Sequence, residues 1–115
     1  MARLLEVRTY RLRPGTAHAF HEVVSDQVVP MLKSRGMDVV AYGVSNHEEE
    51  TYFLVRSYTD REALDQEQSV FYQSSEWRKG PRAQLIDKIE TYLNTLLWCS
   101  EAGVLEMRNL NSPRA

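Results

Sequence analysis

The sequence predicts an α+β fold with the element order β-α-β-β-α-β and a four-stranded antiparallel sheet. Four segments alternate between two kinds of side chain with the period of two that is typical of strands. The segments between them place apolar residues three or four positions apart, as on one face of a helix. This order is that of the split βαβ, or ferredoxin-like, unit, in which the first and third strands lie side by side at the centre of the sheet.

The first strand is predicted over residues 3–13, where Val, Thr and Tyr follow a period of two. Pro14-Gly15 ends this strand. A helix follows and ends at Arg35-Gly36, a cation in the last turn followed by a glycine. Because Pro30 removes one backbone donor from this helix, a bend or break is expected one turn before it.

The second and third strands are predicted over residues 37–45 and 51–58, joined as a hairpin by a polar turn. The third strand runs into a capping box, with Thr59 expected at the N-cap and Glu62 three positions later. This pattern predicts a second helix that extends to about Tyr72.

The remaining elements are a short helix, a fourth strand and a tail. The short helix follows Pro81, and the fourth strand covers residues 91–99. The segment Val104–Arg108 is expected to form a short fifth strand or an arm. We therefore expect one domain over residues 1–108 and a frayed C-terminal tail over residues 109–115.

Length, charge and cysteine content exclude several classes of protein. The chain has 115 residues, enough for one domain. Its 14 basic and 16 acidic residues leave a net charge of −2, so we expect no nucleic-acid partner. Cys99 is the single cysteine, which excludes an internal disulfide, and no apolar stretch is long enough for a membrane span. A reducing cytoplasm is the expected location.

Neither face of the predicted sheet has the polar side chains that are typical of a solvent-exposed face. One set of strand positions is aliphatic and comprises Leu5, Val7, Thr9, Phe53, Val55, Ser57, Leu93, Thr95 and Leu97. The alternate set is aromatic and amphipathic and comprises Glu6, Arg8, Tyr10, Leu12, Tyr52, Leu54, Arg56, Tyr58, Tyr92, Asn94, Leu96 and Trp98. Since the helices cover only one face, the other requires a second sheet, and an identical subunit would supply it. We therefore expect a homodimer; the alternative is a monomer with scattered surface aromatics.

Several motifs together resemble the NIPSNAP family. The run Leu5–Gly15 contains Glu-x-Arg-x-Tyr and ends in Pro-Gly, as that family's opening strand does. The run Val55–Glu62 resembles its strand ending in Tyr before an acidic helix. Glu76-Trp77 is similar to the family's Glu-Trp after the second helix, and Leu105–Pro113 to its closing segment.

This resemblance implies a dimeric α+β barrel. It places the chain in a superfamily of small cofactor-free monooxygenases, cyclases, lactone isomerases and haem enzymes. Cyclases and several monooxygenases of that superfamily carry a histidine on or after the second helix, where this chain has Ser74-Ser75-Glu76-Trp77. Glu76 would then perform the acid–base work of that histidine, or the chemistry differs. The region of the second helix contains no histidine that could ligate haem. We therefore expect no cofactor.

Candidate catalytic residues lie on the two central strands. Arg8 and Tyr10 project from one face, and Arg56 and Tyr58 are expected on the same face of the neighbouring strand. A guanidinium beside a phenol binds and polarises a carboxylate, carbonyl or enolate oxygen. Glu6 would act as a base or hold Arg8. The alternative is a purely structural Arg–Glu pair with tyrosines as interface anchors.

Other candidates lie on the helices. His21 borders the apolar stripe of the first helix and would be a general base near neutral pH, or a boundary histidine without a catalytic role. Phe71, Tyr72 and Trp77 end the second helix and would close a hydrophobic pocket for a small aromatic ligand. The alternative is that Trp77 only fills the gap between this helix and the short helix after Pro81. His18 and His21 have no third partner in the sequence, so no metal site is expected.

These residues lead to two hypotheses. The first is a homodimeric enzyme that uses acid–base chemistry on a small aromatic or carbonyl metabolite, as an isomerase, cyclase or cofactor-free monooxygenase. The second is a non-catalytic binding or scaffold dimer. An enzyme predicts a cavity of a few hundred Å³ lined by convergent polar groups, whereas a scaffold predicts a filled core.

Overall fold

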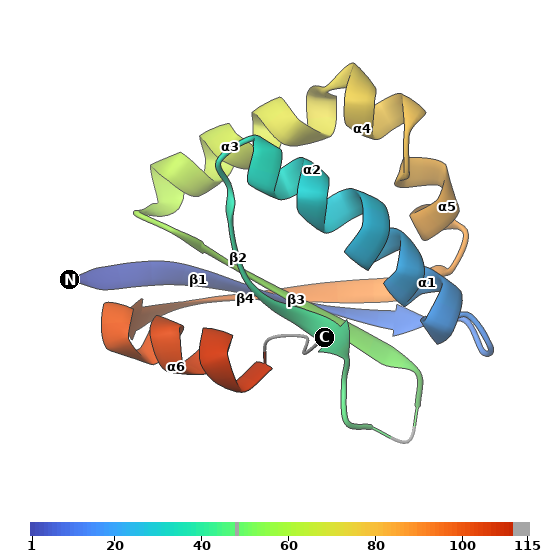
Figure 1. The fold of residues 1–115 in the computed structure, drawn as a ribbon, viewed down its shortest axis with the longest axis horizontal. Helices are drawn as coiled ribbons and strands as arrows, with labels where there is room; N and C mark the ends of the chain where they lie inside the picture. Colours follow the sequence, from blue (N-terminus) through green and yellow to red (C-terminus); the bar gives the residue numbers. More distant parts are fainter. Residues whose placement is uncertain (48, 112–115) are drawn as a thin grey trace.

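A computed structural model describes residues 1–47 and 49–111. The chain forms one antiparallel sheet in the order β2-β3-β1-β4 (Figure 1). Its strands are β1 (Ala2–Leu12), β2 (Asp38–Val44), β3 (Thr51–Tyr58) and β4 (Ile89–Ser100). The predicted α+β fold with a four-stranded antiparallel sheet is therefore confirmed, with β1 and β3 adjacent at its centre.

Five short helices lie over one face of the sheet, and they pack against the aromatic set of strand positions (Figure 1). They are α1 (Ala17–Val23), α2 (Val29–Ser34), α3 (Arg61–Gln73), α4 (Ser75–Lys79) and α5 (Arg82–Ile86). Phe20, Leu32 and Phe71 are almost fully buried between these helices and the sheet. The main core of the domain is thus on this side.

The predicted disturbance before Pro30 is present. Residues Val24–Val28 form a π-helical stretch between α1 and α2, and Pro30 lies in the first turn of α2. Proline cannot donate to the carbonyl four residues back and its ring crowds that carbonyl, so a wider turn at this point accommodates it. Gly36 then ends α2 with a φ of 76°, and the Met37 amide donates to the Leu32 carbonyl at 3.1 Å.

The N-cap of α3 lies one residue later than predicted. Asp60, not Thr59, is the cap, and its carboxylate accepts a hydrogen bond from the Ala63 amide at 2.8 Å. Both residues are good cap formers, and Asp also favours the positive end of the helix dipole. The sequence pattern alone therefore did not separate the two positions.

The prediction of a short strand or an arm over Val104–Arg108 is wrong, because Glu101–Asn111 forms a helix, α6. Val104 and Met107 lie three apart on its inner side and pack against the aliphatic face of the sheet near Leu5 and Val55. The Ser100 hydroxyl accepts from the Gly103 amide at 3.0 Å and so caps the helix. Residues 109–111 continue this helix, and residues 112–115 of the predicted tail lie outside the described residues.

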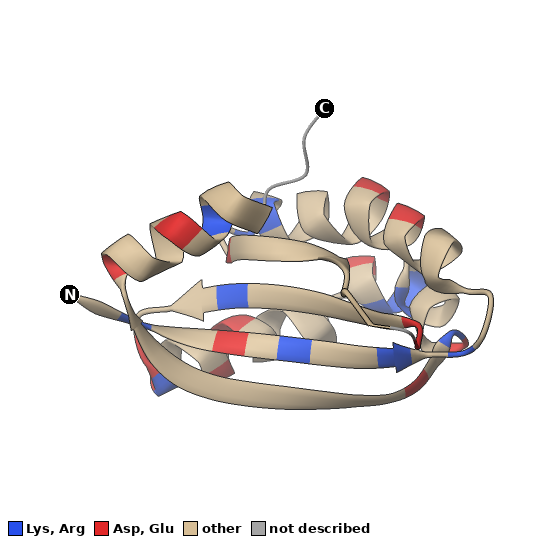
Figure 2. Ribbon diagram, turned by 90° about the horizontal axis from the view of Figure 1, so that it is seen from below, with Lys and Arg blue, Asp and Glu red and all other residues tan. Residues whose placement is uncertain are grey.

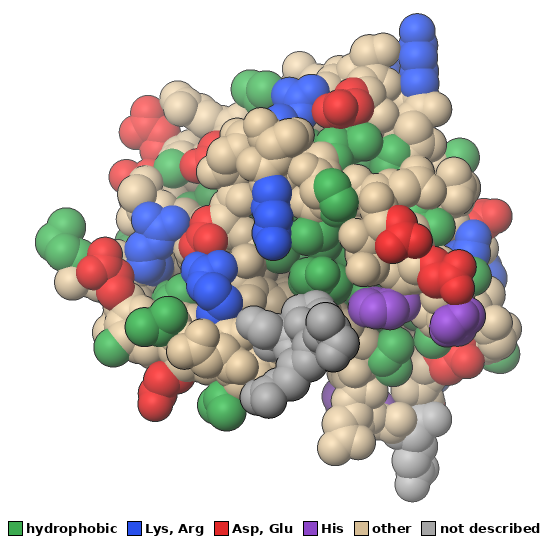
Figure 3. All heavy atoms as spheres, in the orientation of Figure 1, with side chains coloured by type: hydrophobic (Ala, Val, Ile, Leu, Met, Phe, Trp, Pro, Cys, Tyr) green, Lys and Arg blue, Asp and Glu red, His purple; other side chains and the backbone are tan. Residues whose placement is uncertain are grey.

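The aliphatic face of the sheet is only partly covered. Figure 2 looks at the sheet from this side and shows α6 beside the strands, with no helix over the middle of β1 and β4. Figure 3 shows the molecule at right angles to that view, and on this side basic and acidic side chains are interspersed. No helix of the described residues is long and apolar enough to cross a membrane.

Candidate functional site

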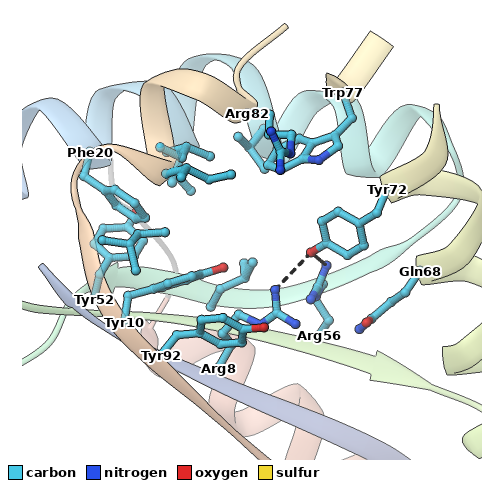
Figure 4. A pocket seen from close by; sticks show the side chains of 16 residues that line it. Arg8, Tyr10, Phe20, Tyr52, Arg56, Gln68, Tyr72, Trp77, Arg82 and Tyr92 are labelled. Atoms are coloured by element: carbon cyan, nitrogen blue, oxygen red, sulfur yellow. Dashed lines mark hydrogen bonds between the residues drawn. The ribbon is translucent and has the colours of Figure 1, made fainter. Parts of the chain in front are cut away.

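A cavity of about 340 Å³ lies between the aromatic face of the sheet and the helices (Figure 4). Its floor is formed by side chains of β1, β3 and β4, and its roof by side chains of α1, α3, α4 and α5. The lining residues that carry polar groups are Arg8, Tyr10, Tyr52, Arg56, Gln68, Tyr72, Trp77, Arg82 and Tyr92. The volume suits a small organic molecule.

A buried ion pair lies at the base of the cavity. Glu6 and Arg56 are directly opposite each other on β1 and β3, and each side chain is no more than 1% exposed. Arg56 Nε donates to Glu6 Oε1 at 2.8 Å. Arg56 Nη2 is 2.6 Å from the same oxygen, but it makes no hydrogen bond of acceptable geometry there. The pair is held rigidly by the register of the two central strands.

The second oxygen of Glu6 accepts from three neighbours. Gln68 Nε2 donates to Glu6 Oε2 at 2.8 Å, and Asn94 Nδ2 donates to it at 3.1 Å. Arg8 Nη2 is 3.4 Å from this oxygen, and Arg8 Nε donates to Asn94 Oδ1 at 2.8 Å. These hydrogen bonds, with those from Arg56, fix the position of the Glu6 carboxylate. Glu6 therefore orients the two arginines.

The Tyr72 hydroxyl is the point where the two guanidinium groups converge. Arg8 Nη1 donates to it at 3.2 Å and Arg56 Nη1 donates at 3.0 Å (Figure 4). Both lone pairs of the phenol oxygen are then occupied, so its proton is free to donate to a third group. Tyr72 lines the cavity, so a group inside the cavity could accept this proton.

The charges of this cluster do not balance. Glu6 supplies one negative charge, whereas Arg8 and Arg56 supply two positive ones. Burial acts to lower the pKa of Arg56, but the neighbouring Tyr72, Tyr58 and Glu6 raise it above its ordinary value. Burial raises the pKa of Tyr10, and Tyr72 adds to this effect. The guanidinium groups thus stay charged and Tyr10 stays protonated at neutral pH.

A family profile for NIPSNAP matches residues 5–100. The chain belongs to the NIPSNAP family. The comparison with curated proteins found no match. The matched region includes all of the sheet except the first three residues of β1, and every helix that roofs the cavity, and it ends just before α6.

Solved structures of NIPSNAP proteins share the fold. A NIPSNAP family protein from Agrobacterium tumefaciens aligns with a TM-score of 0.79 at 16% identity and covers 90% of each chain. A second protein from that bacterium, of unknown function, aligns with a TM-score of 0.78 at 21% identity and covers 85% of this chain and 88% of its own. An uncharacterized NIPSNAP-like domain protein from Burkholderia xenovorans aligns with a TM-score of 0.78 at 17% identity and covers 86% of each.

The structure brings half of the predicted site residues to the cavity. Those that line it are Arg8, Tyr10, Arg56, Tyr72 and Trp77. The others lie behind the lining or outside it.

Three predicted residues lie directly behind the wall of the cavity. Tyr58 is buried and its hydroxyl accepts from Gln68 Nε2 at 3.1 Å. Phe71 is a core residue that packs against Tyr72 with ring centroids 5.0 Å apart. Glu6 is buried under the two arginines as described above.

The two residues expected to move a proton differ in their placement. His21 Nδ1 is 2.6 Å from the hydroxyl of Tyr52, which lines the cavity. Glu76 is exposed on α4, pairs with Arg35 at 3.3 Å and does not line the cavity. The geometry therefore connects His21, but not Glu76, to the site.

Sequence reasoning missed five polar residues of the site, namely Tyr52, Gln68, Arg82, Tyr92 and Asn94. Tyr92 and Asn94 belong to the aromatic set of β4, which pairs Arg8 with Asn94 and Tyr10 with Tyr92. The register of β4 would have identified both. Gln68 and Arg82 lie on helices, where no sequence signal marked them. The described residues contain no cluster of ligands suited to a metal ion.

Because the Tyr58 hydroxyl is buried, we expect the free energy of unfolding to fall at alkaline pH. Burial raises the pKa of Tyr58 to about 12, against the influence of Arg56. Between about pH 10 and pH 12 the unfolded chain therefore releases a proton that the folded chain keeps, so the free energy of unfolding falls as the pH rises. Urea unfolding at about pH 9 and pH 11 measures this fall. Tyr58→Phe should reduce it, whereas Tyr92→Phe, at an exposed position, should not; an equal fall in both variants would contradict the assignment.

Proposed function

We propose that the chain binds a small, largely apolar molecule and places one carbonyl or phenolic oxygen of it at Arg8 and Tyr72. The observation that supports this proposal is the Tyr72 hydroxyl, which accepts from both arginines at the wall of the cavity and so keeps its own proton for a bound molecule. A hydrogen-bond donor backed by two guanidinium groups stabilises negative charge as it develops on such an oxygen. The apolar part of the molecule lies against side chains such as Phe20, Leu54 and Leu85.

We infer that the chemistry is acid–base catalysis on this molecule, of the isomerase, cyclase or cofactor-free monooxygenase type. Tyr72 and Arg8 polarise the oxygen, and Tyr72 donates the hydrogen bond that strengthens as charge develops. Tyr52 lines another part of the cavity, and its hydroxyl contacts His21 Nδ1. His21 then accepts a proton from the bound molecule by way of the Tyr52 hydroxyl. An imidazole is a common general base in enzymes.

Replacing Arg8 with methionine tests this function. We expect it to weaken binding of p-coumaramide, a neutral phenolic probe, by about tenfold or more, because a charge-assisted contact to the probe oxygen is lost. NMR titration measures the affinity. Arg11→Met is the matched control, since Arg11 lies on the same strand but does not line the cavity. The amount of small molecule that co-purifies with each variant, measured by mass spectrometry, should fall in parallel.

The same variant distinguishes an enzyme or binding protein from a scaffold. If Arg8 only stabilises the fold or an interface, Arg8→Met will dissociate or unfold the protein without a specific effect on the probe. Loss of probe binding by a protein with an unchanged oligomeric state supports the proposed site. Unchanged probe affinity in Arg8→Met would overturn it.

We further propose that the protein acts as a homodimer in the cytoplasm, with the aliphatic faces of two sheets packed together. Leu93 and Leu97 of β4 are 71% and 43% exposed on that face. Apolar surface on a long strand at the edge of a sheet favours pairing with another chain. A location in a reducing compartment agrees with the single cysteine, Cys99.

A further inference from the structure

The charged side chains that line the cavity are all of one sign. Three arginines, Arg8, Arg56 and Arg82, contribute to the lining, and among the described residues no aspartate or glutamate does. Glu6 lies behind Arg8 and Arg56 and neutralises only one of them. An apolar cavity with an excess of positive charge attracts anions and disfavours cations. The cavity is therefore complementary to an organic acid.

Arg82 lies apart from the other two arginines. It is the first residue of α5, whereas Arg8 and Arg56 come from the sheet. Figure 4 shows Arg82 beside Trp77, across the cavity from Arg8 and Arg56. The space between them is lined by apolar side chains such as Leu54 and Leu85.

Arg82 also has no internal partner for its charge. Within residues 1–47 and 49–111, its guanidinium makes no ion pair and no hydrogen bond. The other arginines of the cavity are fixed by Glu6, Asn94 and Tyr72. Arg82 is exposed, so its side chain can reach the open side of the cavity without breaking an existing contact. This distinguishes it from a structural arginine.

We propose that the ligand is an organic acid and that Arg82 is the residue that recognises its carboxylate. This inference rests on the proposed function, which places the phenolic or carbonyl oxygen at Arg8 and Tyr72. The substrate class is then an aromatic or unsaturated molecule with an oxygen at one end and a carboxylate at the other. The planar guanidinium of Arg82 binds the carboxylate through two parallel hydrogen bonds.

Binding of p-coumarate and its neutral amide, p-coumaramide, tests this inference. The two probes share the phenol and differ in the group at the other end. We expect the folded wild-type protein to bind p-coumarate about tenfold more tightly, as one charge-assisted contact provides. Arg82→Gln should remove this preference for the acid by weakening the binding of p-coumarate by about tenfold. Arg78→Gln is the matched control, because Arg78 is exposed on the neighbouring helix α4 and does not line the cavity.

The outcomes separate this inference from the proposed function. Equal affinities of the wild type for acid and amide, or a preference for the acid that survives in Arg82→Gln, would overturn the role of Arg82. If the role of Arg82 is overturned but Arg8→Met weakens the binding of both probes, the proposed function still stands. If neither probe binds at millimolar concentration, both proposals fail. A rise in salt concentration should weaken binding of p-coumarate and not of p-coumaramide.

Discussion

Arg56→Met is expected to destabilise the folded chain by about 3–5 kcal/mol. The substitution removes the ion-pair partner of Glu6 at a position where the Glu6 side chain is only 1% exposed. Arg8, Gln68 and Asn94 still contact that carboxylate, but the shortest charged contact, at 2.6 Å from Arg56, is lost. The cost is large because a buried charge loses its closest opposite charge, and the remaining neighbours do not replace it. Urea unfolding monitored by circular dichroism measures it.

Two further variants show whether the effect comes from an unpaired buried charge. Arg61→Met removes an exposed pair with Asp65 on α3 and should cost no more than about 1 kcal/mol. Combining Arg56→Met with Glu6→Gln removes the buried anion while it retains an oxygen that accepts from Gln68 and Asn94. The double variant should therefore regain a large part of the lost stability. If it is no more stable than Arg56→Met, the loss comes from packing and not from charge.

The central part of the site follows directly from the strand pattern. Residues two apart on a strand share a face, so alternation alone placed Arg8 with Tyr10 and Arg56 with Tyr58. The order of elements then made β1 and β3 neighbours, which brings Glu6 opposite Arg56. These steps use only local geometry and short-range topology.

The helical part of the site could not be predicted in the same way. Glu76 and Trp77 are adjacent in sequence, yet Trp77 lines the cavity and Glu76 points toward Arg35. Neighbouring helix positions differ in direction by about 100°, so their roles depend on how α4 docks on the sheet. Gln68 and Arg82 depend on the same docking. Over Val104–Arg108 the segment is so short that the periods of a strand and a helix both fit.

Replacing Leu93 and Leu97 together with lysine is expected to dissociate the proposed dimer. Both side chains are exposed in the single chain, on the face of β4 that points away from the cavity. Burying a leucine contributes about 1.5–3 kcal/mol, and burying an unpaired lysine costs more than is gained. The loss from two positions in each subunit should weaken association by about a thousandfold or more. Sedimentation velocity at micromolar concentration measures the change.

The control for this variant places the same charge on the other side of the molecule. Val70 is 63% exposed on α3, and Val70→Lys adds a lysine without touching β4 or the aliphatic face. It should leave the dimer intact, whereas the β4 variant should sediment as a folded species of 13.4 kDa. Because the cavity is built from one chain, the monomeric variant should also retain affinity for p-coumarate. A wild-type protein that already sediments at 13.4 kDa at micromolar concentration would rule out the paired sheets, since β4 would then tolerate water on its aliphatic side.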